Sequence, residues 1–156
     1  MCSFLVTNWL LTNLTYVNFF MQPRGPDLTS SLTTHSFTFV HNLLHMTGEQ
    51  IVQPFRDSQE DLVALYNGEI YNFEGLVEEG NRFRSDGESI LPSYKKYGIT
   101  FPRKLDGEFA LAVFDFKHHR AVLSTDTFST KPLWYSTYEG LHVASYRSAV
   151  ARLGVP

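Results

Sequence analysis

Cys2 is the residue whose type and position most directly suggest chemistry. It is the single cysteine of the 156-residue chain, and it directly follows the initiator methionine. Removal of Met1 would leave a residue with a thiol, of reference pKa about 8.5, and an α-amine, of reference pKa about 7.7–8.0. Near pH 7, part of this amine is neutral and can act as the base for the neighbouring thiol. The position therefore suggests an N-terminal nucleophile, although a second-position cysteine also occurs by chance.

The composition indicates one globular domain. The sequence is 43% hydrophobic and 15% aromatic, which is enough to form a core. The net charge of −3 and pI of about 6.0 argue against nucleic acid as a partner. One cysteine cannot form an internal disulfide, which is typical of a reducing compartment. The apolar stretch at 3–21 lacks the basic region and cleavage site of a signal peptide and is no membrane span, so we expect a cytoplasmic protein without a membrane partner.

Short apolar and alternating runs predict antiparallel strands that position Cys2 at the tip of the first strand. The expected strands are Ser3–Thr7, Ser36–Leu44, Asp61–Tyr66, Glu108–Phe116, Arg120–Thr125, Leu133–Ser136 and Leu141–Ser145. Asn67 and Gly68 form a dipeptide typical of hairpin turns, so the third strand is expected to end there. Alternation along the fourth strand places Phe109, Leu111 and Val113 on one face of the sheet.

Two helices are expected between the strands. One is a short helix over Tyr71–Glu79, and the other covers Asp86–Tyr97, where Pro92 is tolerated only in a kinked middle or near the first turn. Leu10–Phe20 fits either a short helix or an extended segment, and the stretch Pro23–Ser31 predicts turns. This order of elements predicts an α+β sandwich.

The sequence also resembles a known family. Six segments occur in the order seen in class II glutamine amidotransferase domains: MCSF at the N-terminus, RGPD (Arg24–Asp27), YNGEIYN (Tyr66–Asn72), RSDGE (Arg84–Glu88), LDGEFALAVFD (Leu105–Asp115) and DTFSTKPLWY (Asp126–Tyr135). Over essentially its whole length, the chain is most similar to the glutaminase domain of glutamine-dependent asparagine synthetases. The resemblance implies an N-terminal-nucleophile-hydrolase-like αββα sandwich of antiparallel sheets, here with the C-terminal strands missing.

The resemblance further implies a reaction and the residues that perform it. Glutamine would be hydrolysed to glutamate and ammonia through a thioester on Cys2, with no metal and no cofactor. The Asn67 side-chain amide and the Gly68 backbone N–H match the pair that stabilises the oxyanion. Glu69 and Asp86 match positions near the α-amino group of glutamine, although Asp86 also fits an N-cap of the following helix.

Other matches concern the surroundings of the site. Arg24 in RGPD is expected to support the site structurally, and His45 and Met46 are expected to line the substrate pocket. Ser129 stands where relatives carry glycine, and Lys131 precedes the shared Pro132-Leu133, so that loop is expected to be built differently.

The main departure from the family lies at Leu43. Relatives carry a segment of the type HERLSI, and alignment at His41 puts Leu43 at the position of the arginine that binds the α-carboxylate of glutamine. Charged hydrogen bonds contribute about 1.5–3 kcal/mol each, so glutamine affinity would fall by about one to three orders of magnitude. His41, His45 or Arg56 are candidate replacements. His41 and His45 lack a third ligand nearby, so a metal site is not predicted.

The sequence contains no SGGxDS-type phosphate-binding loop. We therefore expect residues 1–156 to be a single amidotransferase domain, stand-alone or truncated, that supplies ammonia to a separate ATP-dependent synthetase protein. A weakly active or inactive interaction module and an N-terminal-nucleophile amidase with a different substrate are the alternatives.

Overall fold

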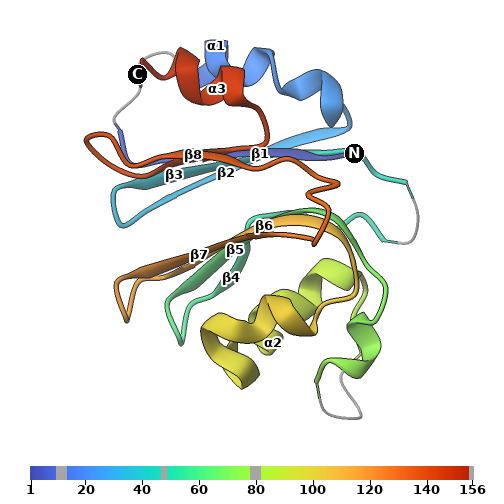
Figure 1. Cartoon of the computed structure of the whole chain (residues 1–156). Coiled ribbons are helices and arrows are strands. Elements are labelled where there is room, and N and C mark those ends of the chain that lie inside the picture. Colours follow the sequence, from blue (N-terminus) through green and yellow to red (C-terminus); the bar gives the residue numbers. More distant parts are fainter. Residues whose placement is uncertain (10–13, 47–48, 78–81, 155–156) are drawn as a thin grey trace.

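The computed structural model describes residues 1–9, 14–46, 49–77 and 82–154. Within these ranges, two antiparallel sheets lie face to face between two helical layers (Figure 1). One sheet has the strand order β2-β3-β1-β9-β8, and the other has the order β4-β5-β6-β7. Helices α1 (Leu14–Phe19) and α3 (Arg147–Arg152) lie outside the first sheet, and α2 (Ile90–Tyr97) lies outside the second. The predicted αββα sandwich is confirmed.

The strands are short and most follow the predicted ranges. The first sheet contains β1 (Ser3–Thr7), β2 (Leu28–Thr34), β3 (Phe37–Leu43), β8 (Trp134–Ser136) and β9 (His142–Ala144). The second contains β4 (Phe55–Asp57), β5 (Leu62–Ile70), β6 (Gly107–Asp115) and β7 (Arg120–Thr125). Single turns and short runs of 3-10 helix occur at Gln22–Arg24, Phe73–Gly75, Asp86–Ser89 and Gly98–Lys104.

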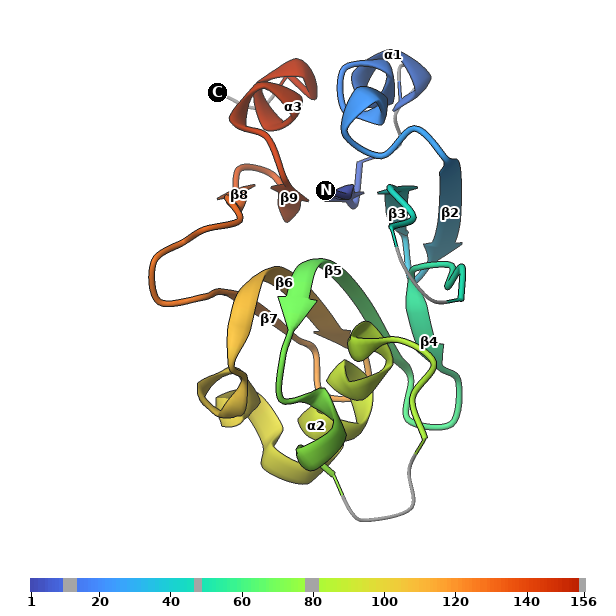
Figure 2. The same ribbon diagram turned by 90° about the vertical axis from the view of Figure 1, so that its right-hand side faces the viewer.

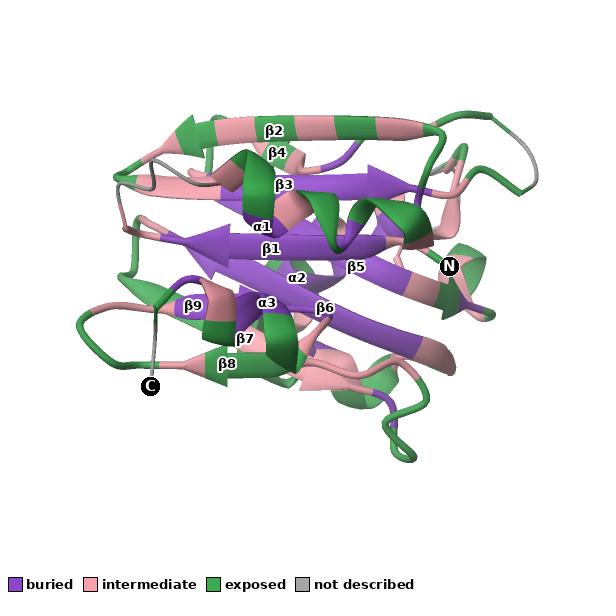
Figure 3. Cartoon of the chain, turned by 90° about the horizontal axis from the view of Figure 1, so that it is seen from above, coloured by how far each residue is buried: buried purple, intermediate pink, exposed green. Residues whose placement is uncertain are grey.

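Side-chain alternation along the strands divides the core into three layers. The layer between the sheets contains Phe4, Val6, Phe39, Val63, Leu65, Ala112, Phe114 and Val143. As predicted, Phe109, Leu111 and Val113 share the opposite face of β6, where they pack against the α2 layer. The third layer lies between the first sheet and its two helices. Figure 3 shows the central strands β1 and β6 buried, whereas the edge strands β2 and β8 carry exposed residues.

Two sequence predictions about turns are wrong. The stretch Pro23–Ser31 does not consist of turns throughout, because β2 begins at Leu28 and its residues alternate between half-buried and exposed. The predicted hairpin turn at Asn67 and Gly68 is also not formed, since β5 continues to Ile70 and both residues pair with β6. Gly68 has a φ of 146°, and a Cβ there would lie 1.9 Å from the carbonyl oxygen of Glu108. Close approach of β6, rather than a turn, requires this glycine.

The helical predictions are confirmed in part. Only the turn at Phe73–Gly75 forms in the first predicted helix, and residues 78–79 lie outside the described residues. In the ambiguous N-terminal segment, α1 is helical and residues 10–13 are not described. α2 tolerates Pro92 because the proline falls in its first turn, where no intrahelical N–H bond is needed. No helix in the described ranges is long and apolar enough to cross a bilayer.

Candidate active site

A cavity of about 550 Å³ opens beside the N-terminus. Every catalytic and substrate-binding residue predicted from the sequence lines this cavity: Cys2, His45, Met46, Asn67, Gly68, Glu69 and Asp86. The first and last of these residues, Cys2 and Asp86, are 84 positions apart in the sequence. The fold therefore assembles the predicted set at one place.

Four elements position these side chains: β1, β3, β5 and a 3-10 turn. β1 lies in the middle of its sheet and faces the second sheet, as Figure 2 shows. Cys2 directly precedes β1, and Leu43 ends the neighbouring strand β3. The last residues of β5 form the facing wall, and the 3-10 turn that begins at Asp86 closes the side toward α2. The cavity thus lies between the ends of the two sheets.

The Cys2 thiol is held by the backbone of Leu44. The Leu44 N–H donates to Sγ over 3.5 Å, and the thiol lies 3.9 Å from the Leu44 carbonyl oxygen. Burial raises the pKa of the Cys2 thiol, while the Leu44 hydrogen bond, the N-terminal ammonium and Arg24 act in the opposite direction. The buried thiol therefore needs a base to become a strong nucleophile at neutral pH.

Met1 occupies part of the cavity wall next to Cys2. Its side chain is 53% exposed, and its sulfur lies 3.6 Å from Nη2 of Arg24. While Met1 is present, its peptide bond ties up the α-nitrogen of Cys2, which then cannot act as a base. Removal of Met1 would free this nitrogen and widen the cavity at the same point.

Asn67 is buried with its hydrogen-bonding capacity unused. Its side chain is 1% exposed, and among the described residues neither Nδ2 nor Oδ1 has a hydrogen-bond partner. Most buried polar groups are paired, so an unpaired amide beside a cavity is a donor ready for a bound group. Gly68, the next residue, lines the same wall.

Asp86 connects the 3-10 turn to the end of β5. Its Oδ2 accepts hydrogen bonds from the Tyr66 hydroxyl, at 2.5 Å, and from the Ile70 N–H, at 2.7 Å. Its Oδ1 accepts from the Gly87 N–H at 2.8 Å. The residue at the N-cap position is Ser85, which makes no side-chain capping bond, so the alternative interpretation of Asp86 as a helix N-cap is wrong. Burial and the Asp86 carboxylate raise the pKa of Tyr66 above its ordinary value, which keeps this hydroxyl a donor.

Glu69 lies at the exposed edge of the cavity. It pairs across the strands with Glu108, whose carboxylate accepts a hydrogen bond of 2.8 Å from Lys131. The Lys131 side chain is 12% exposed and also lines the cavity. Glu69 thus presents a carboxylate that a substrate ammonium group can reach.

Leu43 lines the cavity and provides no charge there. Of the three candidate replacements for the family arginine, His45 lines the cavity, whereas His41 and Arg56 are not among its described lining residues. His41 is completely buried, and Arg56 is exposed on β4.

Arg84 is a cavity residue that the sequence analysis did not single out. Its Nε and Nη2 donate to Oε1 of Glu88 over 3.1 and 2.5 Å, which fixes the guanidinium plane. Nη1 faces the pocket residue Glu49, whose carboxylate oxygen lies 3.9 Å away. Arg84 belongs to the RSDGE segment, so its position in a motif was the available signal.

Arg24 lies outside the cavity. Its guanidinium carbon lies 5.3 Å from the centre of the Tyr146 ring. The adjacent Gly25 has no room for a side chain, because a Cβ would lie 2.1 Å from the carbonyl oxygen of Asn42. This tight packing holds the RGPD segment against β3, next to the strand end that contacts Cys2.

Comparison with known proteins identifies the domain. Residues 4–155 match the family described as glutamine amidotransferase domain. The chain belongs to this family. The matched range covers both sheets and nearly all of the cavity residues.

Two curated relatives are asparagine synthetases. The chain is 37% identical over 116 residues to asparagine synthetase [glutamine-hydrolyzing] 1 of Saccharomyces cerevisiae, covering 71% of this chain and 20% of that protein. It is 32% identical over 138 residues to asparagine synthetase B of Escherichia coli, covering 83% of this chain and 25% of that protein. The chain thus spans about a fifth to a quarter of the length of these relatives.

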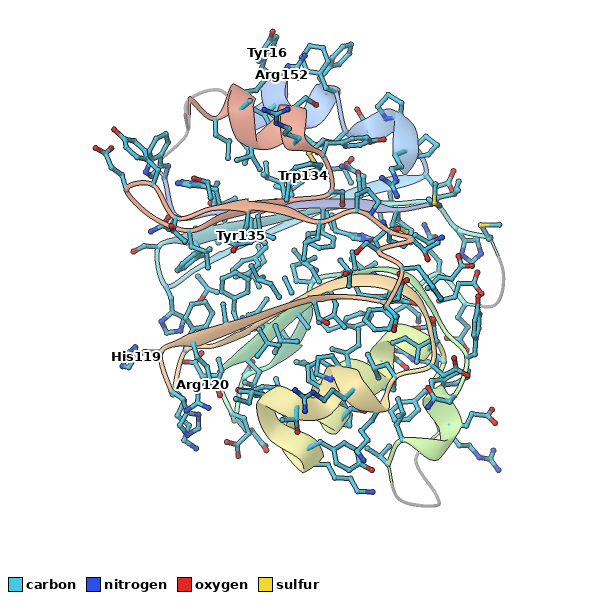
Figure 4. The ribbon with its side chains drawn as sticks, viewed as in Figure 1. Tyr16, His119, Arg120, Trp134, Tyr135 and Arg152 are labelled. Atoms are coloured by element: carbon cyan, nitrogen blue, oxygen red, sulfur yellow. The ribbon has the colours of Figure 1, made fainter. Side chains whose placement is uncertain are left out.

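A solved structure supports the fold assignment. Glutamine phosphoribosylpyrophosphate amidotransferase from B. subtilis aligns with a TM-score of 0.58 at 20% identity, covering 75% of this chain and 29% of that one. The fold of this amidotransferase domain is therefore of the N-terminal-nucleophile-hydrolase type. Figure 4 labels residues on the outer helices, on β8 and where β7 begins, and none of these labelled residues lines the cavity.

Proposed function

We propose that the chain, after removal of Met1, hydrolyses the side-chain amide of glutamine through a thioester on Cys2. The observation that carries this proposal is the buried and unpaired Asn67 amide, which lines the same cavity as the single thiol of the chain. A preorganised donor of this kind stabilises the oxyanion that forms when a nucleophile attacks an amide. Membership of the glutamine amidotransferase family supports the same substrate.

The proposed reaction has two stages. The freed α-amine of Cys2 takes the thiol proton, Sγ attacks the amide carbon, and Asn67 and Gly68 donate to the resulting oxyanion. Collapse of this intermediate breaks the C–N bond, and the amine returns the proton to the leaving nitrogen, which departs as ammonia. Water, deprotonated by the same amine, then attacks the thioester and gives glutamate and the free thiol.

Charged groups on the cavity wall are proposed to bind the amino-acid end of glutamine. Glu69 and Asp86 are the partners for the α-ammonium group, which requires carboxylates in a partly enclosed pocket. Arg84 is the proposed partner for the α-carboxylate, because Leu43 has no charge and Arg84 has its guanidinium plane fixed by Glu88. A substrate carboxylate would take the place of Glu49 beside Nη1.

We further propose that the ammonia serves a separate ATP-dependent synthetase protein. The relatives named above are four to five times longer than the region they share with this chain, and their names describe synthesis as well as glutamine hydrolysis. Co-purification of the chain with a synthetase from its own source would support this step. Quantitative recovery of the chain without a partner under native conditions would contradict it.

A glutaminase assay tests the proposed function. The chain should be purified, shown by mass spectrometry to lack Met1, and assayed for ammonia and glutamate release from glutamine. The Cys2→Ala variant is the matched control, and it should retain the fold and show no activity. Absence of turnover by the processed wild-type chain would contradict the proposal.

Leu43 favours a second candidate function, the hydrolysis of an amide that lacks the α-carboxylate. An apolar residue at that cavity position accommodates an apolar substrate better than a charged one. A panel that compares glutamine with its decarboxylated analogue, 4-aminobutanamide, separates the two. Preference for the analogue would favour the second candidate, and no reaction with any amide would favour a non-catalytic interaction module.

A further inference from the structure

Two buried polar side chains without partners lie in the layer between the sheets. The described residues with unpartnered buried side-chain nitrogen or oxygen atoms are Arg24, His41, Asn67 and Ser93. Ser93 lies in α2, and Arg24 lies on the helical side of the first sheet. His41 and Asn67 are therefore the two that remain between β3 and β5, close to the end of the sandwich that holds Cys2.

His41 faces the second sheet from β3. It pairs with Phe4 of β1, and Phe4 and Phe39 on the same face of the sheet belong to the layer between the sheets. The His41 ring is 0% exposed and lies against the backbone of Tyr66, and among the described residues neither ring nitrogen has a partner in hydrogen-bonding geometry. Tyr66 directly precedes Asn67, so the ring lies beside the residue that carries the proposed oxyanion donor.

The protonation state of His41 suits a hydrogen-bonding role. Burial lowers the pKa of His41 to about 4, so the ring is neutral near pH 7 and offers one N–H donor and one acceptor. A buried polar group without a partner destabilises the fold, and a leucine of similar volume would avoid this cost. An imidazole at this position therefore calls for an explanation that packing does not give.

The side-chain oxygen of Asn67, Oδ1, needs a hydrogen-bond donor. If Nδ2 points to the substrate oxyanion, Oδ1 points away from it and has no partner among the described residues. Amide oxygens accept hydrogen bonds, and the neutral His41 ring has an N–H to give. Ring and amide make no direct hydrogen bond, so a single ordered water between them is the simplest connection.

We propose that His41 is a positioning residue, which holds the Asn67 amide through one buried water so that Nδ2 points into the cavity. This inference rests on the proposed function, because it concerns the donor of the oxyanion hole. Without His41, the Asn67 amide can rotate and present its oxygen to the cavity, where it would repel the oxyanion. The effect acts on the transition state and not on bound glutamine, so it should lower kcat and leave KM nearly unchanged.

Substitution of His41 separates this role from simple packing. His41→Leu should lower kcat for glutamine by about tenfold to a hundredfold, with KM within twofold, because a misplaced oxyanion donor loses much of its effect. Its thermal stability should be equal to or higher than that of the wild type. His41→Gln retains a neutral donor and should recover part of the lost kcat. Ser93→Ala, which also removes a buried unpartnered group, is the matched control and should leave kcat unchanged.

A double-mutant cycle gives the decisive readout. If His41 acts through Asn67, His41→Leu should have no further effect on kcat in an Asn67→Ala background. Independent, multiplicative losses in the double variant would overturn the inference, as would an unchanged kcat in active His41→Leu. If His41→Leu does not fold, His41→Gln completes the same cycle. An inactive wild-type chain would instead remove the proposed function itself, so the two failures are distinguishable.

Discussion

The Sγ atom of Cys2 lies 3.5 Å from the backbone nitrogen of Leu44, which donates a hydrogen bond to it. This contact connects the residue before β1 to the residue after β3, so the pairing of these two strands fixes the nucleophile. The N–H favours the thiolate, whereas burial raises the pKa of the thiol and is the larger effect. The geometry therefore positions the sulfur but leaves its activation to a base.

The first prediction concerns the reactivity of Cys2 before and after processing. The rate of alkylation of Cys2 by iodoacetamide rises with pH as the thiol loses its proton. With Met1 retained, the midpoint of this rise should lie at higher pH in the folded chain than in denaturant, because burial raises the pKa of the thiol. After removal of Met1, the α-ammonium group on Cys2 itself should shift this profile toward lower pH. The two forms can be prepared with and without co-expressed methionine aminopeptidase. Identical profiles for folded and denatured chains would contradict the prediction.

The second prediction concerns Arg84. Arg84→Gln should raise KM for glutamine by about tenfold to a hundredfold and change kcat little, because a charged contact to the substrate carboxylate is lost. The stability of the fold should change little, since an exposed ion pair contributes little. Arg82→Gln is the matched control, because Arg82 is an exposed neighbouring arginine outside the cavity lining. If Arg84→Gln and Arg82→Gln have equal KM values for glutamine, another group binds the substrate carboxylate.

The elements whose sequence signal is local form where the sequence predicts them. The strands around Phe4, Leu111 and Val122 show clear apolar patterns, and all of them form where expected. β2 was missed because it is an edge strand with serine and threonine on its exposed side, so its alternation is not one of apolar and polar residues. The three-residue strand β4 is too short to give a periodic signal.

The sequence predicts which residues line the site, but it does not predict the contacts that these residues make. Cys2, Asn67 and Asp86 were identified through a family resemblance, since their separation in the chain gives no local pattern. Gly68 suggested a turn because Asn-Gly dipeptides favour hairpins, and the requirement set by the nearby Glu108 carbonyl is a tertiary one. The contacts of Arg84 with Glu88 likewise depend on how the 3-10 turn meets the cavity.

A third prediction concerns the pH dependence of stability. The pKa of His41 falls from 6.5 to about 4 on folding, so the unfolded chain binds a proton between these values and the folded chain does not. The free energy of unfolding should therefore decrease as pH falls from 6.5 to 4, by about 3 kcal/mol from this residue. Urea unfolding at pH 7 and pH 4.5 measures this difference. His41→Leu should show a smaller loss of stability between the two pH values than the wild type, because all other titrating groups are the same in both proteins. Parallel pH dependence in both proteins would contradict the prediction.

A fourth prediction concerns Ser129, which lies between β7 and β8. Its φ is 52°, in the left-handed region that costs residues with a Cβ about 1–2 kcal/mol. Ser129→Gly should raise the free energy of unfolding by about 1 kcal/mol, reduced slightly by loss of the exposed contact of 3.1 Å with Thr125. Ala151→Gly, at an exposed helical position of α3, is the control and should lower stability by about 1 kcal/mol. Destabilisation by both changes would show that the serine contact outweighs the strain.

Covalent labelling of Cys2 tests the central claim most directly. The processed chain should be incubated with 6-diazo-5-oxo-L-norleucine, a glutamine analogue that alkylates the nucleophile of enzymes that bind glutamine, and examined by intact and peptide mass spectrometry. We predict one adduct for each chain, located on an N-terminal Cys2, with protection by excess glutamine and no adduct in Cys2→Ala. No adduct on a folded chain that lacks Met1, or an adduct that persists in Cys2→Ala, would contradict the assignment of Cys2 as the nucleophile.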